Sequence, residues 1–493
     1  MSESKSSYQQ ILKSTSLFGG VQVFNMLIAV VRSKFIAVFI GPDGMGIAAL
    51  LNTTINLVSS FTTLGLETSA VKFLSQYHAE GDFEKLSRTV AVLKKIMWIT
   101  GISGAVLLLC SAPLLSRIVF GTSAYTVSFL WISVALLLKQ LSTCHLAILQ
   151  GMHRLKILAR VNLLGSFFGL IVSIPFYYYL KIASIVPTII IASASVFIFS
   201  YYYSSKIKLE KPIVPAKALY ADGKGMIQLG LRMSLAAILT LFCSYMIQLY
   251  IGNNGGLSQV GFYNAGFTIL NTYVGLVFTA MATDYFPRLS AVITNVSKSA
   301  AIVQQQSFTG ILIITPIVVV FLAFSKWIVH LLFSENFSTI VPMVSIGILG
   351  MLFRVVSFSI GYMVLIKADA RLFMTNAFGF NLLYFLLHIG GYYFYGLLGL
   401  GVAFTLHYFL HFVLLAILSF YKYNFALDKE FIKNFGICVF LCGWAFAVGF
   451  LDNGFVKYLL SGLSIVTAFV FSFVQINKKT DLLAIISRFK NKK

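Results

Sequence analysis

The sequence predicts an all-α, polytopic membrane protein with about 14 transmembrane helices, and three observations support this fold class. The 493 residues are 58% hydrophobic and only 11% charged, whereas soluble domains average about 25% charged residues. Apolar segments long enough to span a bilayer, about 20 residues each, follow one another along the chain. A helix with one polar face occurs twice, about half a chain apart, which suggests two repeats that share one cavity.

The apolar segments fit two parallel six-helix pseudo-repeats, arranged as V-shaped lobes, plus two C-terminal helices. An even number of helices per repeat lets both repeats enter the membrane in the same direction. The predicted spans are residues 15–39, 44–66, 96–112, 124–147, 162–180, 183–203, 226–251, 261–285, 306–325, 340–366, 373–394, 397–420, 436–452 and 456–476. The predicted domains are a cytoplasmic N-terminus (1–14), the N-lobe (15–210), a linker with the C-lobe (211–425), and two helices with a basic cytoplasmic tail (426–493).

The basic residues divide unequally between the two ends of these spans. Of the 37 lysines and arginines, 28 fall in loops on one face and four on the other. Because positive loops face the cytoplasm, both termini are expected there. The first helix is expected to be retained, since no cleavage pattern precedes it. The net charge of +22 is then explained by topology and contact with anionic lipid, and no nucleic-acid partner is expected.

The second and eighth predicted spans carry a polar stripe at helical spacing. Lipid disfavours such a face, so it should contact protein or water. Hydrogen bonding between helices remains an alternative explanation. The stripes, about 212 residues apart, are Asn52, Asn56, Ser59, Ser60 and Thr63, and Asn264, Thr268, Asn271, Thr272 and Gly275.

Two basic residues lie mid-way along equivalent spans. Lys139 in the fourth span and Arg354 in the tenth are roughly 20 Å from the outer helix ends at 1.5 Å per residue, too deep for easy snorkelling. We interpret them as cations that line the cavity from both lobes, with buried structural pairing as the alternative. Further candidate substrate contacts are Arg32, on a stripe with Gln22 and Asn25, and Arg232, and contact of these two arginines with lipid headgroups is the alternative. The remaining membrane cation is Lys34, for which a lipid-facing position is expected.

No Asp or Glu lies in the middle of any predicted span. A basic cavity lined by Asn and Thr favours an anion rich in hydroxyl groups, such as a phosphorylated glycan, because Arg and Lys bind phosphate. Glu67 and Asp284 are placed at the cytoplasmic ends of the striped helices, and ion pairs with Lys72, Arg288 and Arg232 could close an inner gate. The membrane histidines and five cysteines suggest no metal site, and no cofactor is predicted.

Five short motifs resemble the Wzx-type flippases for lipid-linked oligosaccharides, within the multidrug/oligosaccharidyl-lipid/polysaccharide exporter superfamily. The resemblance covers most of residues 10–425 and is nearest the O-antigen and enterobacterial common antigen translocases. The motifs are Phe35–Gly46 (FIAVFIGPDGMG), Val71–His78 (VKFLSQYH), Tyr285–Ser290 (YFPRLS), Leu332–Phe337 (LFSENF) and Gly361–Phe373 (GYMVLIKADARLF).

This resemblance implies a transporter, not an enzyme, that moves undecaprenyl-pyrophosphate glycan from the inner to the outer leaflet by alternating access. The two C-terminal helices resemble an extra pair in the related lipid II flippases, where they form a groove for the lipid tail. Expected partners are this substrate and membrane lipids, and they could extend to a polymerase and a chain-length regulator. The chain is expected as a monomer.

Two other functions are less compatible with the residues. A cation-coupled multidrug exporter would need an acidic cavity, and the predicted cavity is basic. The drug-exporting branch of the superfamily has a carboxylate in the first span, where this chain has Gln22, Asn25 and Arg32. A membrane glycosyltransferase or polymerase would need carboxylates or arginines in a substantial outer loop, and the predicted outer loops are short.

Overall fold

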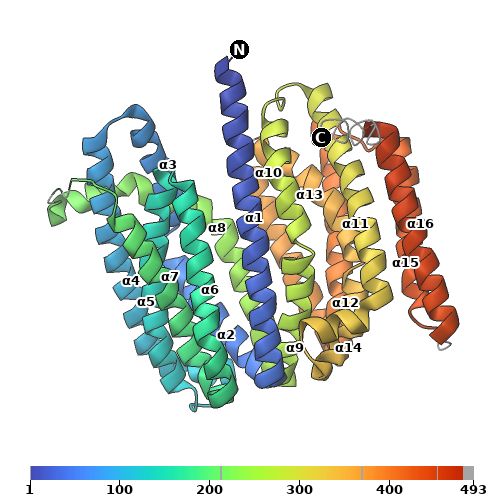
Figure 1. Ribbon diagram of the computed structural model, residues 1–493, viewed down its shortest axis with the longest axis horizontal. Coiled ribbons are helices and arrows are strands. Elements are labelled where there is room, and N and C mark those ends of the chain that lie inside the picture. The colour runs from blue at the N-terminus through green and yellow to red at the C-terminus, as the bar shows by residue number, and fades with distance from the viewer. Residues whose placement is uncertain (1, 211, 213, 368–369, 452–453, 481–493) are drawn as a thin grey trace, which may run out of the picture. The chain divides into compact units, whose positions relative to one another are not determined.

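The computed structural model describes residues 2–210, 212, 214–367, 370–451 and 454–480. Over these residues every regular element is helical, which confirms the all-α class (Figure 1). Contacts divide the chain into two compact units. The first unit comprises Met1–Asn264 and Leu332–Ser334, and the second comprises Ala265–Leu331 and Glu335–Lys493.

The first unit is a bundle in which α4, α5, α6 and α7 lie side by side, while α8 packs on α2, α3 and α4 (Figure 1). Its apolar core therefore includes α8, the first helix after the predicted linker. The elements of this unit are α1 (Ser2–Phe39), α2 (Gly41–Thr62), α3 (Leu66–Glu80), α4 (Phe83–Phe120), α5 (Thr126–Gly151), α6 (Leu155–Leu180), η1 (Lys181–Ser184), α7 (Ile185–Ser205), α8 (Ala216–Gly255) and the start of α9 (Leu257–Thr268).

The second unit contains the longest helical stretch, α14, which packs along α12 and α13. Its elements are the end of α9, the π-helical η2 (Ile269–Tyr273), α10 (Leu276–Ser290), α11 (Val296–Leu332), η3 (Glu335–Ile340), α12 (Val341–Gly347), α13 (Gly350–Ile366), α14 (Ala370–Tyr423), α15 (Lys429–Val448) and α16 (Gly454–Thr480).

The helices of the described chain account for the fourteen predicted spans. Eleven are long and apolar enough to cross a membrane, or twelve when α12 and α13, bent by 50°, are taken as one span. Two of these stretches hold two spans each. Leu155–Ser205 is interrupted by η1, and Met374–Tyr423 is broken at Gly396, whose φ of 55° is readily adopted only by glycine. The protein is therefore a multi-pass membrane protein.

The predicted inner loop 67–95 proves to be helical throughout most of its length. Residues Leu66, Ala70 and Leu74 of α3 are fully buried and pack on Leu86 and Leu93 of α4. The helix α3 therefore buries its apolar face against protein. The third span is accordingly longer than the predicted 96–112, because α4 begins at Phe83.

Capping residues explain where several helices begin. Pro42 stands in the first turn of α2, where its missing N–H costs nothing. Asp82 caps α4 by accepting a hydrogen bond from the Lys85 backbone N–H at 2.9 Å. The side chain of Lys85 also donates to this carboxyl, and both bonds hold the pKa of Asp82 below its ordinary value.

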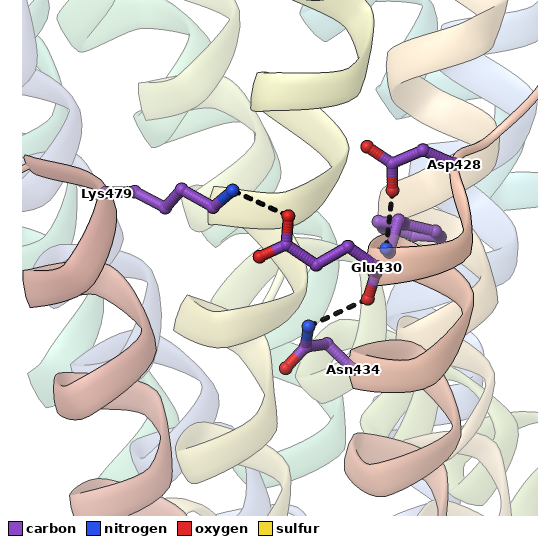
Figure 2. Close-up of polar contacts among 5 residues, drawn as sticks. Asp428, Glu430, Asn434 and Lys479 are labelled. Atoms are coloured by element: carbon purple, nitrogen blue, oxygen red, sulfur yellow. Dashed lines mark hydrogen bonds and ion pairs between the residues drawn. The ribbon is translucent and has the colours of Figure 1, made fainter.

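The two C-terminal helices form a hairpin, with α15 and α16 side by side (Figure 1). Asp428 caps α15 by accepting from the Phe431 backbone N–H at 2.6 Å, and Lys479 of α16 pairs with Glu430 of α15 at 2.7 Å (Figure 2). Asn434 donates to the Glu430 carbonyl at 2.8 Å. The ring of Phe435 contacts Phe353 and Phe412, so that α15 is joined to α13 and α14.

Candidate functional site

A cavity of about 210 Å³ lies among α1, α2, α5, α6 and α7, entirely within the first unit. Isoleucine and alanine side chains form its apolar walls, and no Asp or Glu is found among the described residues that line it. Its polar lining residues are Arg32, Asn52, Asn56, Lys139, Tyr177, Thr188 and Ser193. Four residues predicted from sequence as substrate contacts, on three different helices, therefore meet in one basic, hydroxyl-rich and amide-rich cavity.

Lys139 is half-buried, and its ammonium donates to Asn56 Oδ1, which belongs to the striped helix α2. The Asn56 amide does not neutralise the charge of Lys139. No carboxylate among the described residues lies within hydrogen-bond distance of this ammonium. Arg32 contributes a second cation, and its Nε is buried with no hydrogen-bond partner in the described part of the chain. Two cations that form no ion pair within the described residues make this cavity suited to an anion.

The second unit contains a similar contact. Arg354 is half-buried in α13 and donates from Nη1 to Asn271 Oδ1 at 2.9 Å. Asn271 lies in the π-helical turn η2, a type of irregularity frequent at functional sites. The guanidinium carbon lies 4.8 Å from the ring centroid of Phe278 and 5.0 Å from that of Tyr408.

These two contacts occupy equivalent places in the repeat. Each cation lies 83 residues after its asparagine, and the two contacts are separated by 215 residues. The repeat register is therefore 215, not the predicted value of about 212, so that Asn56 corresponds to Asn271 instead of Thr268. The apolar runs before the two stripes both end in Ile-Gly, at Ile40-Gly41 and Ile251-Gly252, and this match misplaced the alignment. The helix α2 begins at Gly41, whereas α8 continues to Gly255 and α9 begins only at Leu257.

The same register appears where the first turns of α2 and α9 meet. A Cβ on Gly46 would lie 2.1 Å from the carbonyl oxygen of Leu257, and one on Gly261 would lie 2.0 Å from that of Pro42. Pro42 and Leu257 are themselves 215 residues apart, so the contact is reciprocal. Next to it, the Ser258 hydroxyl donates to Asp43, again an equivalent pair. The two repeats thus meet here through glycines that allow the backbones to approach closely.

The remaining predicted substrate residues lie elsewhere. Gln22 and Arg232 are exposed on α1 and α8, and Asn25 is half-buried with its Oδ1 unpartnered among the described residues. Thr63 follows the end of α2, is buried, and donates to the Ser59 carbonyl at 2.8 Å. Two further members of the stripe, Asn264 and Thr268, are half-buried in α9 and have interaction partners.

The proposed gating residues form one ion pair. Asp284 and Arg288, one turn apart in α10, are joined at 2.8 Å, and Arg288 also donates to Gln305 at 2.9 Å. Glu67 opens α3 instead of ending the striped helix, because the chain turns at Leu64 and Gly65 with positive φ. Glu67 and Lys72 are both exposed, and no ion pair within the described residues includes either.

The membrane histidines pack with aromatic rings. His145 shares a hydrogen bond of 2.7 Å with Ser204. His388 donates from Nδ1 to the Tyr384 carbonyl at 2.7 Å, and His407 stacks on His411 within α14. Across the described residues, no group of three His, Cys, Asp or Glu side chains has the geometry of a metal site.

Five residues of the two sites were not predicted from sequence. They are Tyr177, Thr188 and Ser193 in the cavity, and Phe278 and Tyr408 beside Arg354. Aromatic residues occur in every span, so nothing in the sequence marks the two rings that flank a cation. Thr188 and Ser193 share the span at 183–203 with Ser184, Ser195 and Ser200, so the sequence does not single them out.

Comparisons with known proteins agree with this organisation. Residues 35–342 match the family described as "Polysaccharide biosynthesis protein". The chain is 21% identical over 362 residues to proteins named "Lipid III flippase" from Escherichia coli (strain K12) and Shigella flexneri, which covers 69% of this chain and 82% of each relative.

Two solved structures show the same fold. The lipid II flippase MurJ, in an inward closed conformation, matches with a TM-score of 0.71 at 16% identity, over 95% of this chain and 99% of that chain. An inward-facing multidrug resistance MATE family transporter of the MOP superfamily matches with a TM-score of 0.67 at 13% identity, over 83% and 96% of the two chains. The fold is therefore that of MOP superfamily transporters. Since the family match covers more than half of the residues of this chain, the chain belongs to the polysaccharide biosynthesis protein family.

Proposed function

We propose that this protein is a flippase that moves an undecaprenyl-pyrophosphate-linked oligosaccharide, an O-antigen unit or a similar surface glycan, from the cytoplasmic to the outer leaflet of the bacterial inner membrane. The observation that carries the proposal is the pair of equivalent contacts, Lys139 with Asn56 and Arg354 with Asn271. Each lobe then supplies one cation at the same repeat position to the pyrophosphate.

The cavity of the first unit supports a glycan ligand as well as an anion. Amides and hydroxyls of Asn52, Tyr177, Thr188 and Ser193 can bind sugar hydroxyls, while Lys139 and Arg32 attract negative charge. The names of the relatives, lipid III flippase and lipid II flippase, support a lipid-linked substrate. A cation-coupled multidrug exporter, the second function considered, would be disfavoured by these cations.

Transport would proceed by alternating access, without catalysis, between two six-helix lobes with both termini in the cytoplasm. Ion pairs of Glu67, Lys72, Asp284, Arg288 and Arg232 would close the inner gate when the cavity opens outward. The substrate and membrane lipids are the proposed partners of a monomer. A polymerase and a chain-length regulator would act on the flipped product.

The test replaces Lys139 or Arg354 by Ala and measures surface glycan in cells and flipping in proteoliposomes. Either substitution should abolish surface glycan while the protein remains at its normal level in the membrane. Lys139→Arg should be milder, because the charge is kept although its geometry changes. Lys326→Ala, at an exposed lysine outside both sites, is the matched control. Full activity of both alanine variants at normal expression would refute the proposal.

A further inference from the structure

The guanidinium of Arg354 is held on three sides. Its carbon lies 4.8 Å from the Phe278 centroid and 5.0 Å from the Tyr408 centroid, and these rings come from different helices, α10 and α14. Cation–π attraction favours a cation over a ring face at such distances. Asn271 accepts from Nη1 at 2.9 Å. The three contacts restrict rotation of a side chain that otherwise has several rotamers.

The same contacts leave one edge of the guanidinium free. Nε and Nη2 have no hydrogen-bond partner among the described residues, and neither is among the buried unpartnered atoms. Arg32 differs in this respect, since its Nε is buried. The Nε and Nη2 donors of an arginine lie in one plane and match two oxygens of one phosphate. The accessible edge of Arg354 is therefore the edge that binds oxyanions in a bidentate manner.

Lys139 has a different environment. Its ammonium contacts Asn56, and no cation–π contact to it occurs among the described aromatic rings. An ammonium is a compact charge with rotatable donors and has no preferred plane. At equivalent positions of the two repeats, Arg354 must be oriented to bind an anion with two donors, whereas Lys139 need not be.

We infer that Phe278 and Tyr408 are positioning residues that orient the Arg354 guanidinium for side-on, bidentate recognition of one phosphate group, whereas Lys139 supplies charge alone. This inference rests on the proposed function and specifies how the pyrophosphate is recognised. The rings do not contact the substrate; they act through the plane of Arg354. The aromatic face of each ring is the required feature, and the hydroxyl of Tyr408 is dispensable.

The test measures binding of inorganic pyrophosphate to the purified full-length protein in nanodiscs by calorimetry. Phe278→Leu and Tyr408→Leu should each weaken binding roughly 3- to 30-fold, the range given by one cation–π contact. Phe278→Tyr and Tyr408→Phe should bind as the unmodified protein does, since both keep the ring. Arg354→Lys should weaken binding about tenfold or more, because one phosphate contact is lost.

Phe353→Leu is the matched control, because Phe353 precedes Arg354 on α13 but its ring contacts Phe409, Phe412 and Phe435. It should leave pyrophosphate affinity unchanged even if stability falls. In the Phe278→Leu background, Arg354→Lys should cost less than it does alone, which a purely structural role of the ring would not produce.

The outcomes separate the inference from the proposed function. If Arg354→Ala binds pyrophosphate as the unmodified protein does, the role of Arg354 in the proposed function is wrong. If Arg354→Ala weakens binding while the folded Phe278→Leu and Tyr408→Leu variants do not, only the positioning role is overturned. Equal affinity of the Arg354→Lys variant and the unmodified protein would also overturn it.

Discussion

At the scale of single residues, the amides beside the two membrane cations matter as much as the cations. Asn56 and Asn271 each accept a hydrogen bond from a cation without neutralising it. A carboxylate at the same place would form an ion pair and remove the attraction for an anion. Two unit charges about 4 Å apart interact by roughly 4 kcal/mol at an effective dielectric of about 20. Replacement of either asparagine by the isosteric aspartate should therefore have a large effect on anion binding.

We therefore predict that Asn56→Asp lowers flipping at least about tenfold, a change that corresponds to only about 1.4 kcal/mol. The measurement is the flipping rate in proteoliposomes, with folding checked by size exclusion and thermal unfolding. Asn254→Asp, the same change at an exposed residue near the end of α8, should flip normally. A folded Asn56→Asp variant that flips at the unmodified rate would contradict the prediction.

At the scale of elements, the contact between the first turns of α2 and α9 depends on two glycines. Any Cβ at Gly46 or Gly261 would lie near 2 Å from a backbone carbonyl oxygen, and backbone cannot move aside as a flexible side chain can. Because the contact is reciprocal, substitution of either glycine should separate the same two backbones. The contact should then be lost to a similar degree in both variants.

The measurement is disulfide formation between cysteines placed at Asp43 and Ser258, which the contact brings together. Gly46→Ala and Gly261→Ala should each reduce the cross-linked fraction severalfold. Gly252→Ala is a suitable control, since a Cβ there would meet only a methyl of Val260 at 3.3 Å. Unchanged cross-linking in both test variants would show that the glycines are not needed for the contact.

The C-terminal hairpin allows two kinds of interaction to be compared by magnitude. Lys479 and Glu430, whose ion pair Figure 2 shows, are each about half exposed, with 50% and 52% of their side chains accessible. Such pairs typically contribute only about 0–1 kcal/mol. Phe435 contacts Phe353, Phe412 and Phe431 with centroids 5.7–5.8 Å apart. Each aromatic pair is worth about 0.5–1.5 kcal/mol, so the rings should dominate.

Glu430→Gln should therefore change the unfolding free energy by less than about 1 kcal/mol, whereas Phe435→Ala should cost roughly 2–4 kcal/mol. Unfolding in mixed detergent and denaturant micelles provides the measurement. Phe440→Ala, at a ring that is 68% exposed, controls for the loss of an aromatic side chain. The explanation fails if the Glu430 variant is the less stable of the two.

The elements also show how far sequence reasoning reaches. Apolar length located all fourteen spans, because a helix must satisfy its backbone polar groups within the bilayer. The same reasoning missed the true start of α4, since residues 83–95 are polar enough to be read as a loop. It also missed the turn at Ile269–Tyr273, which depends on packing and has no periodicity of its own.

For the sites, unusual residues were informative and ordinary ones were not. A lysine or an arginine in mid-membrane is costly, so Lys139 and Arg354 could be singled out without a structure. The partners Asn56 and Asn271 were among many polar residues of the stripes, and only the hydrogen bonds distinguish them. Phe278 and Tyr408 are two of 70 phenylalanines and tyrosines, which explains why composition could not identify them.

At the scale of the whole molecule, the charge distribution bears on what drives transport. The described residues that line the cavity or contact Arg354 include cations, amides, hydroxyls and aromatic rings, but no carboxylate. The prediction is that flipping needs no carboxylate within the membrane. A substrate that carries negative charge is itself acted on by the membrane potential, by about 2.3 kcal/mol per charge per 100 mV for a full crossing.

In proteoliposomes, an imposed potential that is negative on the substrate side should accelerate flipping, and one of opposite sign should slow it, with sodium and proton gradients absent. The two orientations of the reconstituted protein are separated by blocking one with an impermeant thiol reagent at a cysteine introduced into the segment 206–215, between α7 and α8. Lys139→Gln should weaken the binding of substrate, yet residual flipping should still respond to the sign of the potential, because the moving charge belongs mainly to the substrate. Strict dependence on a sodium or proton gradient, with no response to potential alone, would show that an ion is coupled to transport and that the substrate's own charge does not drive it.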